Sequence, residues 1–257
     1  MKHIIILYSG GLDSLIMKKL SERDYPDARV TGLFFNHGQD SLDAELQSLP
    51  YWVIVKRMDW LGNDIKPVAK KSDPFAGAIY IPGRNLVFCV LAACYYQPDE
   101  IWLGVLADEN NDQATDKNDK FVSLTEDALN YVLSPFKDSV KIVFPLSDRG
   151  WTKTDAIKSL MDSGHLSEEE IKATTSCWFN NGKPCGECKQ CLKRALVLRN
   201  FGIVENHAGT HPLFPDNTFG QNLMNQYMEC SNPNEDEKAM QRLIVAFRQD
   251  KKYWEVL

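Results

Sequence analysis

Residues 2–14 read KHIIILYSGGLDS, an apolar run that leads directly into a glycine-rich polar hexapeptide. Lys2–Tyr8 has the short, branched composition of a buried parallel strand. Ser9–Ser14 then forms a tight loop, and Leu15 and Leu20 fit one face of a following helix. A strand, a glycine turn and a helix in this order predict the start of a nucleotide-binding α/β domain.

The hexapeptide has the features of a phosphate-binding loop. Gly10 and Gly11 let the backbone approach a phosphate closely, and the start of the following helix offers N–H groups and a positive dipole end. Ser9 and Ser14 add hydroxyl groups. Asp13 suits such a loop if it orients a backbone amide or holds Mg²⁺. The alternative is a plain strand–turn–helix that Asp13 caps. The loop is neither a Walker A motif nor a G-x-G-x-x-G fingerprint.

Strands and helices alternate through the first 164 residues. This order predicts an α/β fold with a doubly wound, mostly parallel sheet, in which ligands bind beyond the carboxyl ends of the strands. The site is therefore expected in the loops after Tyr8, Phe35 and Val105. Capping boxes are predicted at Ser123 with Glu126 and at Thr152 with Asp155. The further strands are expected at Val30–Phe35, Val53–Val55 and Ile101–Val105, and the further helices at Val87–Tyr96, Ser123–Leu133 and Thr152–Ser163.

Residues 165–257 differ in character and are expected to form a second region, a cysteine knuckle followed by a helical and loop-rich tail. Glu235–Asp250 reads as a terminal helix, because apolar residues recur on one of its faces. These residues are Met240, Leu243, Ile244 and Phe247.

Four cysteines crowd into this second region with the spacing C-x₇-C-x₂-C-x₂-C: Cys177, Cys185, Cys188 and Cys191. Four thiolates are the preferred ligands of a closed tetrahedral zinc site, and an iron–sulfur cluster is the chemical rival. Cys89 and Cys94 lie in an apolar stretch and read as core residues.

Composition narrows the class of protein. The chain has 257 residues, of which 44% are hydrophobic, so it can bury a core without disulfides. Its net charge of −6 argues against a protein that coats nucleic acid. No targeting segment or membrane span is visible, and a cytoplasmic protein is expected.

The hexapeptide Ser9–Ser14 resembles S-G-G-x-D-S, the signature of the PP-loop ATP pyrophosphatase superfamily, whose members cleave ATP to AMP and pyrophosphate. Further segments resemble the QueC family of 7-cyano-7-deazaguanine synthases. Residues 80–85 read YIPGRN where that family has Y-V-P-G-R-N, and Gly38-Gln39 is similar to the end of its Y-G-Q. Pro145-Leu146 with Thr152-Lys153 is similar to its P-L…T-K segment, and the cysteine pattern is similar to its own. The resemblance covers about residues 1–205.

The chain departs from the family in two loops. Asp40-Ser41 stands where the family has basic residues, and residues 107–116 replace a Y-S-G-Y-P-D-C-R-like loop in which only Asp116 aligns. That loop would help to hold the base, so the departure bears on the substrate.

The resemblance implies an ATP-dependent ligase that converts 7-carboxy-7-deazaguanine and ammonia to the 7-cyano compound through adenylated intermediates. ATP, Mg²⁺ and Zn²⁺ would be the cofactors, no nucleic acid or membrane would be bound directly, and a homodimer is compatible with the sequence. The loop residues Ser9, Gly10, Gly11, Leu12, Asp13 and Ser14 would hold the pyrophosphate portion, with the backbone of Leu7 and Tyr8 near adenine.

The resemblance also gives roles to residues outside the loop. Arg84 would be a cation near the ATP phosphates, and Asn85 would contact ligand or cap the next helix. Lys153 would neutralise phosphate charge or lie solvated on its helix. Gln39 and Asp116 would face the substrate, Asp116 by accepting from the amine of a guanine-like base unless it is a surface residue. His37 is given no catalytic role.

Three alternatives remain open on the sequence. A related enzyme could stop at the amide or adenylate another carboxylate. A tRNA thiolase would call for a catalytic cysteine pair and a basic face. A zinc-stabilised nucleotide-binding module could lack turnover.

Overall fold

The computed structural model describes residues 1–39, 42–58, 61, 81–112, 114–177, 179 and 183–250. The chain divides into two compact units, Met1–Thr174 and Thr175–Leu257. The boundary predicted from the sequence, after residue 164, lies shortly before this one. None of the described helices is long and apolar enough to cross a membrane.

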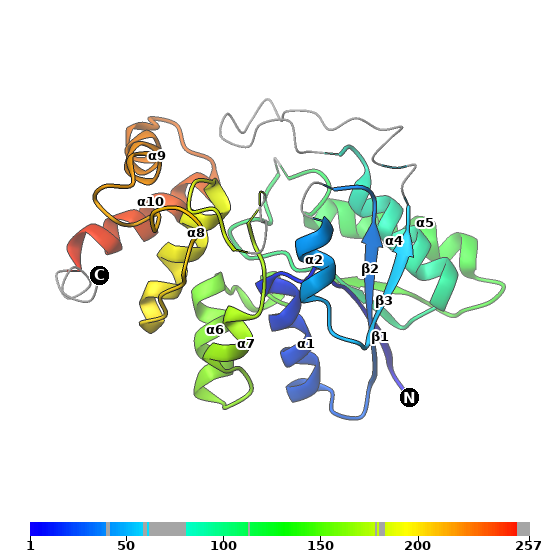
Figure 1. Cartoon of the computed structure of the whole chain (residues 1–257). Helices are drawn as coiled ribbons and strands as arrows, with labels where there is room; N and C mark the ends of the chain where they lie inside the picture. Colours follow the sequence, from blue (N-terminus) through cyan, green and yellow to red (C-terminus); the bar gives the residue numbers. More distant parts are fainter. Residues whose placement is uncertain are drawn as a thin grey trace. The chain divides into compact units, whose positions relative to one another are not determined.

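The first unit is built on a five-stranded parallel sheet with the strand order β3-β2-β1-β4-β5, which confirms the predicted fold class (Figure 1). β1 lies at the centre, with Ile5 in register with Thr31 on one side and Ile101 on the other. The fourth strand is shorter than predicted, and the fifth was not predicted. The strands are β1 (His3–Leu7), β2 (Arg29–Asn36), β3 (Val53–Arg57), β4 (Glu100–Trp102) and β5 (Lys141–Val143).

Helices cover both faces of this sheet. α4 (Arg84–Tyr96) and α5 (Asp119–Leu133) bury Cys89 and Leu129 in a core that also contains Ile5 of β1. Ile4 and Ile6 point to the opposite face because side chains alternate along a strand, and there α1 contacts β1 and α6. The remaining helices of this unit are α1 (Leu12–Asp24), α2 (Leu42–Ser48), η1 (Ser147–Arg149), α6 (Lys153–Asp162) and α7 (Glu168–Lys172).

Local signals fix where two of these helices begin. The predicted capping box at Thr152 and Asp155 is present and starts α6. The box predicted at Ser123 is wrong, because α5 begins earlier, where Asn118 accepts a hydrogen bond from the Phe121 amide at 2.9 Å. Glu126 instead accepts from the Ile142 amide at 2.6 Å and so ties α5 to β5.

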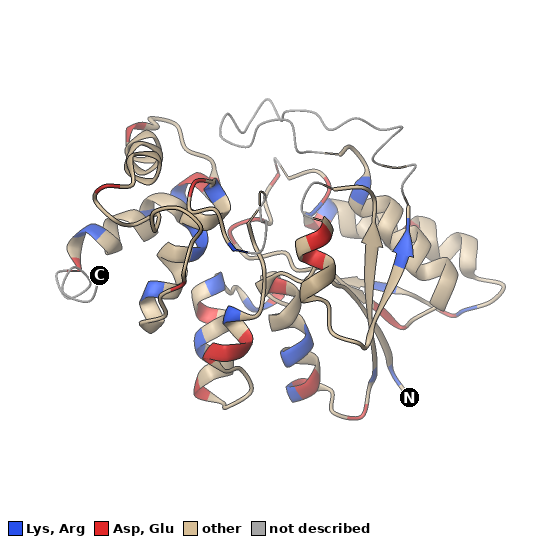
Figure 2. Ribbon diagram, in the orientation of Figure 1, with Lys and Arg blue, Asp and Glu red and all other residues tan. Residues whose placement is uncertain are grey.

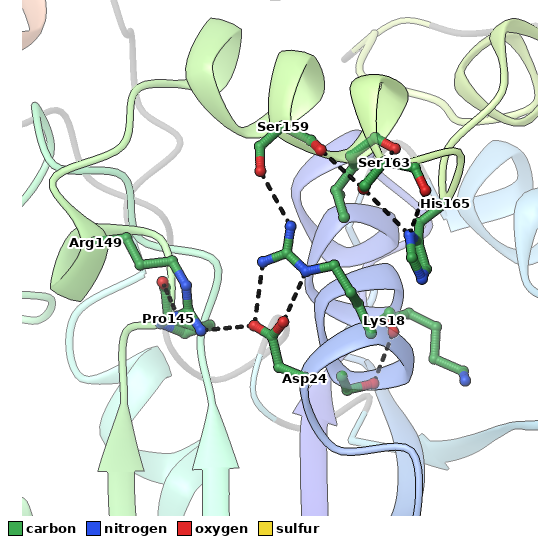
Figure 3. A network of polar contacts seen from close by, with 10 residues as sticks. Lys18, Asp24, Pro145, Arg149, Ser159, Ser163 and His165 are labelled. Carbon is green, nitrogen blue, oxygen red and sulfur yellow. Dashed lines mark hydrogen bonds and ion pairs between the residues drawn. The ribbon is translucent and has the colours of Figure 1, made fainter.

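A polar network joins the end of α1 to the segment before α6 (Figure 3). Asp24 accepts from Arg23 at 2.7 Å and from Arg149 at 2.8 Å, and Arg23 also donates to Ser159 of α6 at 3.0 Å. Both guanidinium groups lie within 6 Å of the Trp151 ring, at 5.9 and 5.7 Å from its centroid. Because Trp151 stands just before α6, this network fixes the start of that helix.

The second unit is helical and contains α8 (Lys189–Leu198), η2 (Arg199–Phe201), α9 (Thr218–Glu229) and α10 (Glu235–Gln249). The predicted terminal helix is confirmed as α10, which packs against α8 and α9. Met240, Ile244 and Phe247 are buried, as the periodicity predicted, and Leu243 is half-buried.

Candidate functional site

The hexapeptide after β1 forms a tight loop at the carboxyl edge of the sheet. Gly10 has a φ of +75°, and a Cβ atom there would lie 2.2 Å from Ser48 Oγ and 3.2 Å from the Glu45 carbonyl oxygen. Gly11 occupies the cap position of α1, and no described side chain caps the helix. The alternative in which Asp13 caps α1 is therefore wrong, and the first amides of α1 are left for an anion.

Asp13 and Lys153, two residues singled out from the sequence, form an ion pair. The Asp13 Oδ2 atom lies 3.0 Å from Lys153 Nζ, and the second oxygen, Oδ1, is buried with no hydrogen-bond partner among the described residues. A Cβ atom on Gly104, after β4, would lie 3.1 Å from Asp13 Cβ. A buried carboxylate oxygen without a partner fits a divalent cation, so Asp13 would be a ligand of Mg²⁺.

The other residues of the loop differ in what they can offer a ligand. The Ser14 hydroxyl donates to the Gly11 carbonyl at 2.7 Å and is buried, whereas Ser9 is exposed. Tyr8 and Leu12 are buried. Tyr8 packs edge-on against Trp52 at 5.0 Å, and burial raises its pKa to about 12. Leu12 can therefore meet a nucleotide only through its backbone.

The loop after β2 is held by its own polar side chains. Gln39 accepts from the His37 amide at 3.1 Å and donates to Glu45 of α2 at 2.5 Å, so both ends of its amide are engaged. The His37 ring is buried beside Phe88, 5.9 Å between centroids. Burial, and then the charge of Arg84, lower the pKa of His37 to about 4. Asp40 and Ser41 lie outside the described residues.

The start of α4 brings two predicted residues together. Gly83, with a φ of +73°, occupies the cap position of α4, so Asn85 lies in the first turn and the prediction that it caps this helix is wrong. The Asn85 side chain donates to the Asp116 carbonyl at 3.1 Å and to Asp116 Oδ2 at 3.2 Å. Asp116 is buried, so it is not a surface residue. Tyr80, the first residue of the family-like segment, lies outside the described residues.

A cavity of about 290 Å³ lies beside this loop, along the outer side of α1. Its charges pair with one another, because Lys18 contacts Glu22 at 2.7 Å and Lys19 contacts Glu170. The charges therefore cancel, which does not favour an anionic ligand. The other side chains that line it come from Tyr8, Leu15, Ser48, Pro50, Trp52, Ala173 and Thr174.

The four cysteines of the second unit form a cluster that could hold a metal such as zinc. Their sulfur atoms all lie within 4.8 Å of one another, and those of Cys185 and Cys191 are 3.9 Å apart. A regular tetrahedron with Zn–S bonds of about 2.3 Å has sulfur–sulfur edges of about 3.8 Å. Hydrogen bonds from Cys188 and Cys191 hold the pKa of Cys177 well below its usual range, whereas burial raises the pKa of Cys185 and hydrogen bonds with Cys177 and Cys188 raise that of Cys191.

Backbone amides and a buried ion pair support this cluster. The Cys177 sulfur accepts from the Cys185 amide at 3.3 Å, and the Cys188 sulfur from the Cys191 amide at 3.4 Å. Nearby, Arg194 donates two hydrogen bonds to Glu205, at 2.7 and 2.8 Å, with both side chains nearly buried.

One residue that the sequence did not single out also holds the knuckle. Asn217 donates to the carbonyls of Gly186 and Thr210, at 3.2 and 2.7 Å. The Ala208 amide donates to the Pro184 carbonyl at 2.8 Å. The segment after residue 205 therefore packs on the cysteine loop. No sequence motif marks Asn217, because its partners are main-chain atoms of distant residues.

The two sequence comparisons with known proteins agree on one family. Residues 61–202 match the family model of queuosine biosynthesis protein QueC. A 7-cyano-7-deazaguanine synthase from Methanosphaera stadtmanae is 26% identical over 228 residues, which cover 78% of this chain and 95% of that protein. One from Prochlorococcus marinus strain AS9601 is 30% identical over 219 residues, which cover 75% and 92%. Among solved structures, the U34-tRNA thiolase NcsA from Methanococcus maripaludis is 13% identical with a TM-score of 0.37, covering 95% of this chain and 72% of that one.

Proposed function

The chain belongs to the QueC family, and from this premise we propose that it is an ATP-dependent ligase that makes 7-cyano-7-deazaguanine from 7-carboxy-7-deazaguanine and ammonia. The observation that carries the proposal is the extent of the similarity, since the chain spans at least 92% of each synthase described above. We expect a cytoplasmic enzyme that acts on small molecules and not directly on nucleic acid.

The phosphate loop would bind the pyrophosphate portion of ATP through its backbone amides. Lys153 lies within reach of the same charge, because it already contacts Asp13 at 3.0 Å. A lysine that meets charge as it develops on the phosphates stabilises the transition state. Mg²⁺, bound at Asp13, would supply further neutralisation of the phosphate charge. Arg84, the first residue of α4, would be a second cation near ATP.

The chemistry requires activation of a poor electrophile. The carboxylate oxygen attacks the α-phosphorus of ATP, and pyrophosphate leaves. Ammonia then displaces AMP from the carbonyl carbon and loses a proton, which gives the amide. A second ATP adenylates the amide oxygen, and loss of AMP and a proton gives the nitrile. The phosphate loop would therefore serve twice in one turnover.

The base would be read at Asp116, which Asn85 orients. A carboxylate is well suited to accept two N–H bonds from a guanine-like edge. Gln39 would help to position the substrate indirectly, by fixing the loop after β2. Its side-chain amide accepts from the His37 amide and donates to Glu45.

Asp116→Asn tests this assignment. The change replaces an acceptor by a donor, a mismatch worth roughly 1–3 kcal/mol, so the KM for the base should rise about 5- to 150-fold while the KM for ATP changes little. Asp112→Asn, at an exposed position of the same loop, is the control. Equal effects on both Michaelis constants would mean that Asp116 does not read the base.

A second candidate is an enzyme that stops at the amide or adenylates another carboxylate. The departure of residues 107–116 from the family pattern favours it, because this loop contains the residue that would read the base.

One assay separates the two candidates. The protein is incubated with ATP, ammonia and 7-carboxy-7-deazaguanine, and the products are identified by mass spectrometry together with the amount of AMP. The proposal predicts the nitrile and two AMP per product, whereas the second candidate predicts the amide and one. If neither product forms from this substrate, the proposed substrate is wrong.

A further inference from the structure

The part of the chain after residue 202 lies beyond the match to the family model, which covers residues 61–202. We call residues 203–250 the extension. Three of its residues donate hydrogen bonds to three consecutive carbonyl oxygens of the cysteine loop. The pairs are Ala208 with Pro184 at 2.8 Å, Gly209 with Cys185 at 3.3 Å, and Asn217 with Gly186 at 3.2 Å. The extension therefore holds the turn of the metal-binding loop along its backbone.

Asn217 reaches one sulfur of the cluster through a single peptide group. Its side-chain nitrogen donates to the Gly186 carbonyl at 3.2 Å, and the N–H of the same peptide, from Glu187, donates to Cys185 Sγ at 3.3 Å. Hydrogen bonds linked in this way polarise and strengthen one another. A donor at position 217 therefore strengthens the hydrogen bond that the Cys185 sulfur accepts.

A second peptide group gives the extension the same access to Cys177. The Pro184 carbonyl accepts from the Ala208 amide at 2.8 Å, and the N–H of that peptide, from Cys185, donates to Cys177 Sγ at 3.3 Å. Groups that bond to metal ligands without touching the metal orient these ligands and tune their affinity. The extension therefore acts on two of the four sulfurs.

Two glycines allow this close contact. Gly186 has a φ of +78°, and a Cβ atom there would lie 2.5 Å from the Thr210 carbonyl oxygen. A Cβ atom on Gly209 would lie 3.1 Å from the Cys185 carbonyl oxygen. The Asn217 side chain also donates to the Thr210 carbonyl at 2.7 Å, so it fastens the extension and the cysteine loop to each other.

The extension also covers positive charge beside the cluster. Lys189 and Lys193 of α8 are each 7% exposed, and Lys189 Nζ lies 5.8 Å from the centroid of the Tyr227 ring of α9. Figure 2 shows basic side chains along α8 and almost no charge on α9. A zinc ion held by four thiolates carries net negative charge, which buried cations stabilise more than exposed ones. The composition of α9 fits a cover for α8 and not a nucleic-acid surface, which would require cations.

We propose that the extension clamps the cysteine loop and retains zinc there, with Asn217 as a positioning residue that acts through the Gly186–Glu187 peptide on the Cys185 sulfur. Asn217 also has a second role, since its Oδ1 atom accepts from the Gly220 amide at 2.7 Å and caps α9. A test must therefore remove the donor and keep the cap. This inference does not depend on the proposed activity.

Asn217→Ser removes the donor, and the serine hydroxyl keeps the cap. Asn234→Ser is the matched control, because Asn234 caps α10 in the same way and accepts from the Glu237 amide at 2.9 Å. Competition with a chromophoric chelator measures the zinc affinity of each full-length chain. Asn217→Ser should bind zinc about 10- to 100-fold more weakly than the parent, the usual loss when a group behind a metal ligand is removed. Asn234→Ser should match the parent. An unchanged affinity in Asn217→Ser, an equal loss in both variants, or a parent that binds no zinc would overturn the proposal.

Replacement of zinc by Co²⁺ separates an effect on the sulfur from an effect on stability. A sulfur that loses a hydrogen bond gives up an electron more easily, so the sulfur-to-cobalt charge-transfer band of Asn217→Ser should move to lower energy. Loss of packing alone would reduce the amount of metal bound and leave the band in place. Weaker binding with the band at the parent's position would therefore overturn the role given to Asn217.

Ala208→Pro tests the second peptide group, because proline has no N–H to donate to the Pro184 carbonyl. This variant should release zinc to excess chelator faster than the parent, whereas Ala208→Gly, which retains the amide, should release it at about the parent's rate. Equal rates in Ala208→Pro and Ala208→Gly would refute the clamp. Circular dichroism of the zinc-loaded chains checks that each variant is folded.

Discussion

Asp13 is the residue on which the charge of the phosphate loop depends. One of its oxygens contacts Lys153 and the other is buried without a described partner. Asp13→Asn and Lys153→Met should each lower ATP turnover about 100- to 1,000-fold, the usual loss when one group that stabilises transition-state charge is removed. Their melting temperatures should change little, because a partly exposed ion pair contributes about 0–1 kcal/mol.

Lys158→Met is the matched control for this prediction. Lys158 lies on the same helix as Lys153, but it is exposed and contacts only Asp162 among the pairs described for it. Its loss should leave turnover unchanged. The assignment fails if Asp13→Asn retains activity within a few-fold of the parent.

His37 should make the stability of the fold depend on pH. Its pKa is lowered to about 4 in the folded chain and is about 6.5 when unfolded. Between these values only the unfolded chain binds the proton, so the free energy of unfolding falls as the pH drops through this window. From pH 7 to 5 the loss attributable to His37 is about 2 kcal/mol.

Denaturant unfolding of the parent and of His37→Phe at pH 7 and pH 5 measures how much of the loss in unfolding free energy comes from His37. The variant should lose about 2 kcal/mol less than the parent between the two pH values. His165→Phe, at a more accessible site, is the control, and the remaining histidines affect parent and variant alike. A pH dependence unchanged in His37→Phe would show that folding does not lower the pKa of this ring.

At the scale of an element, the phosphate loop requires glycine at position 10. Gly10→Ala would place a Cβ atom in a left-handed conformation that costs about 1–2 kcal/mol and against Ser48 Oγ. ATP turnover should fall strongly, and the melting temperature should drop by several degrees.

The double variant Gly10→Ala with Ser48→Ala separates the two causes. Removing Ser48 Oγ relieves the closest contact but not the strained φ, so stability should be restored only in part. Full restoration would mean that the backbone conformation contributes little. Gly38→Ala, where φ is also positive but a Cβ atom meets nothing, is the control for strain alone.

Elements with a regular apolar pattern or a local capping signal were predictable from the sequence, whereas the short strand β5 was not. β1, α6 and α10 follow from apolar periodicity and from a capping box. β5 escaped prediction because it has three residues, of which only Ile142 is buried. α5 is capped by Asn118 and begins at Asp119, not near Ser123, and Glu126 accepts from the Ile142 amide, a partner that no local pattern reveals.

At the scale of the whole molecule, metal and folding should be linked in the second unit. We expect one zinc per chain, since four sulfur atoms at these distances complete a tetrahedral shell. Cys188→Ser should lose the metal and destabilise this unit, because structural zinc contributes directly to folding. Elemental analysis and proteolytic sensitivity of residues after 175 measure the two effects.

Two results would contradict the zinc prediction. Iron with visible absorption would indicate a cluster of another kind. A metal content and melting curve unchanged in Cys188→Ser would mean that this thiolate is not a ligand. Cys230→Ser, outside the cluster, serves as the control.

The site was predictable in its outline and not in its contacts. Loops after parallel strands must meet at one edge of the sheet, so the proximity of the phosphate loop to the loop after β4 follows from topology. The pairing of Asp13 with Lys153, of Asn85 with Asp116, and of Asn217 with the knuckle depends on side-chain directions that only the packed structure defines.

The central position of β1 has a consequence for synthesis on the ribosome. β1 is the first strand to leave the ribosome. Ile5 of β1 can pair with Ile101 of β4 only after β4 has also been synthesised. At about 5–20 residues per second this interval lasts roughly 5–20 s. During that time one edge of the most apolar strand stays open to other chains, so a chaperone that shields nascent chains should raise the yield of this protein.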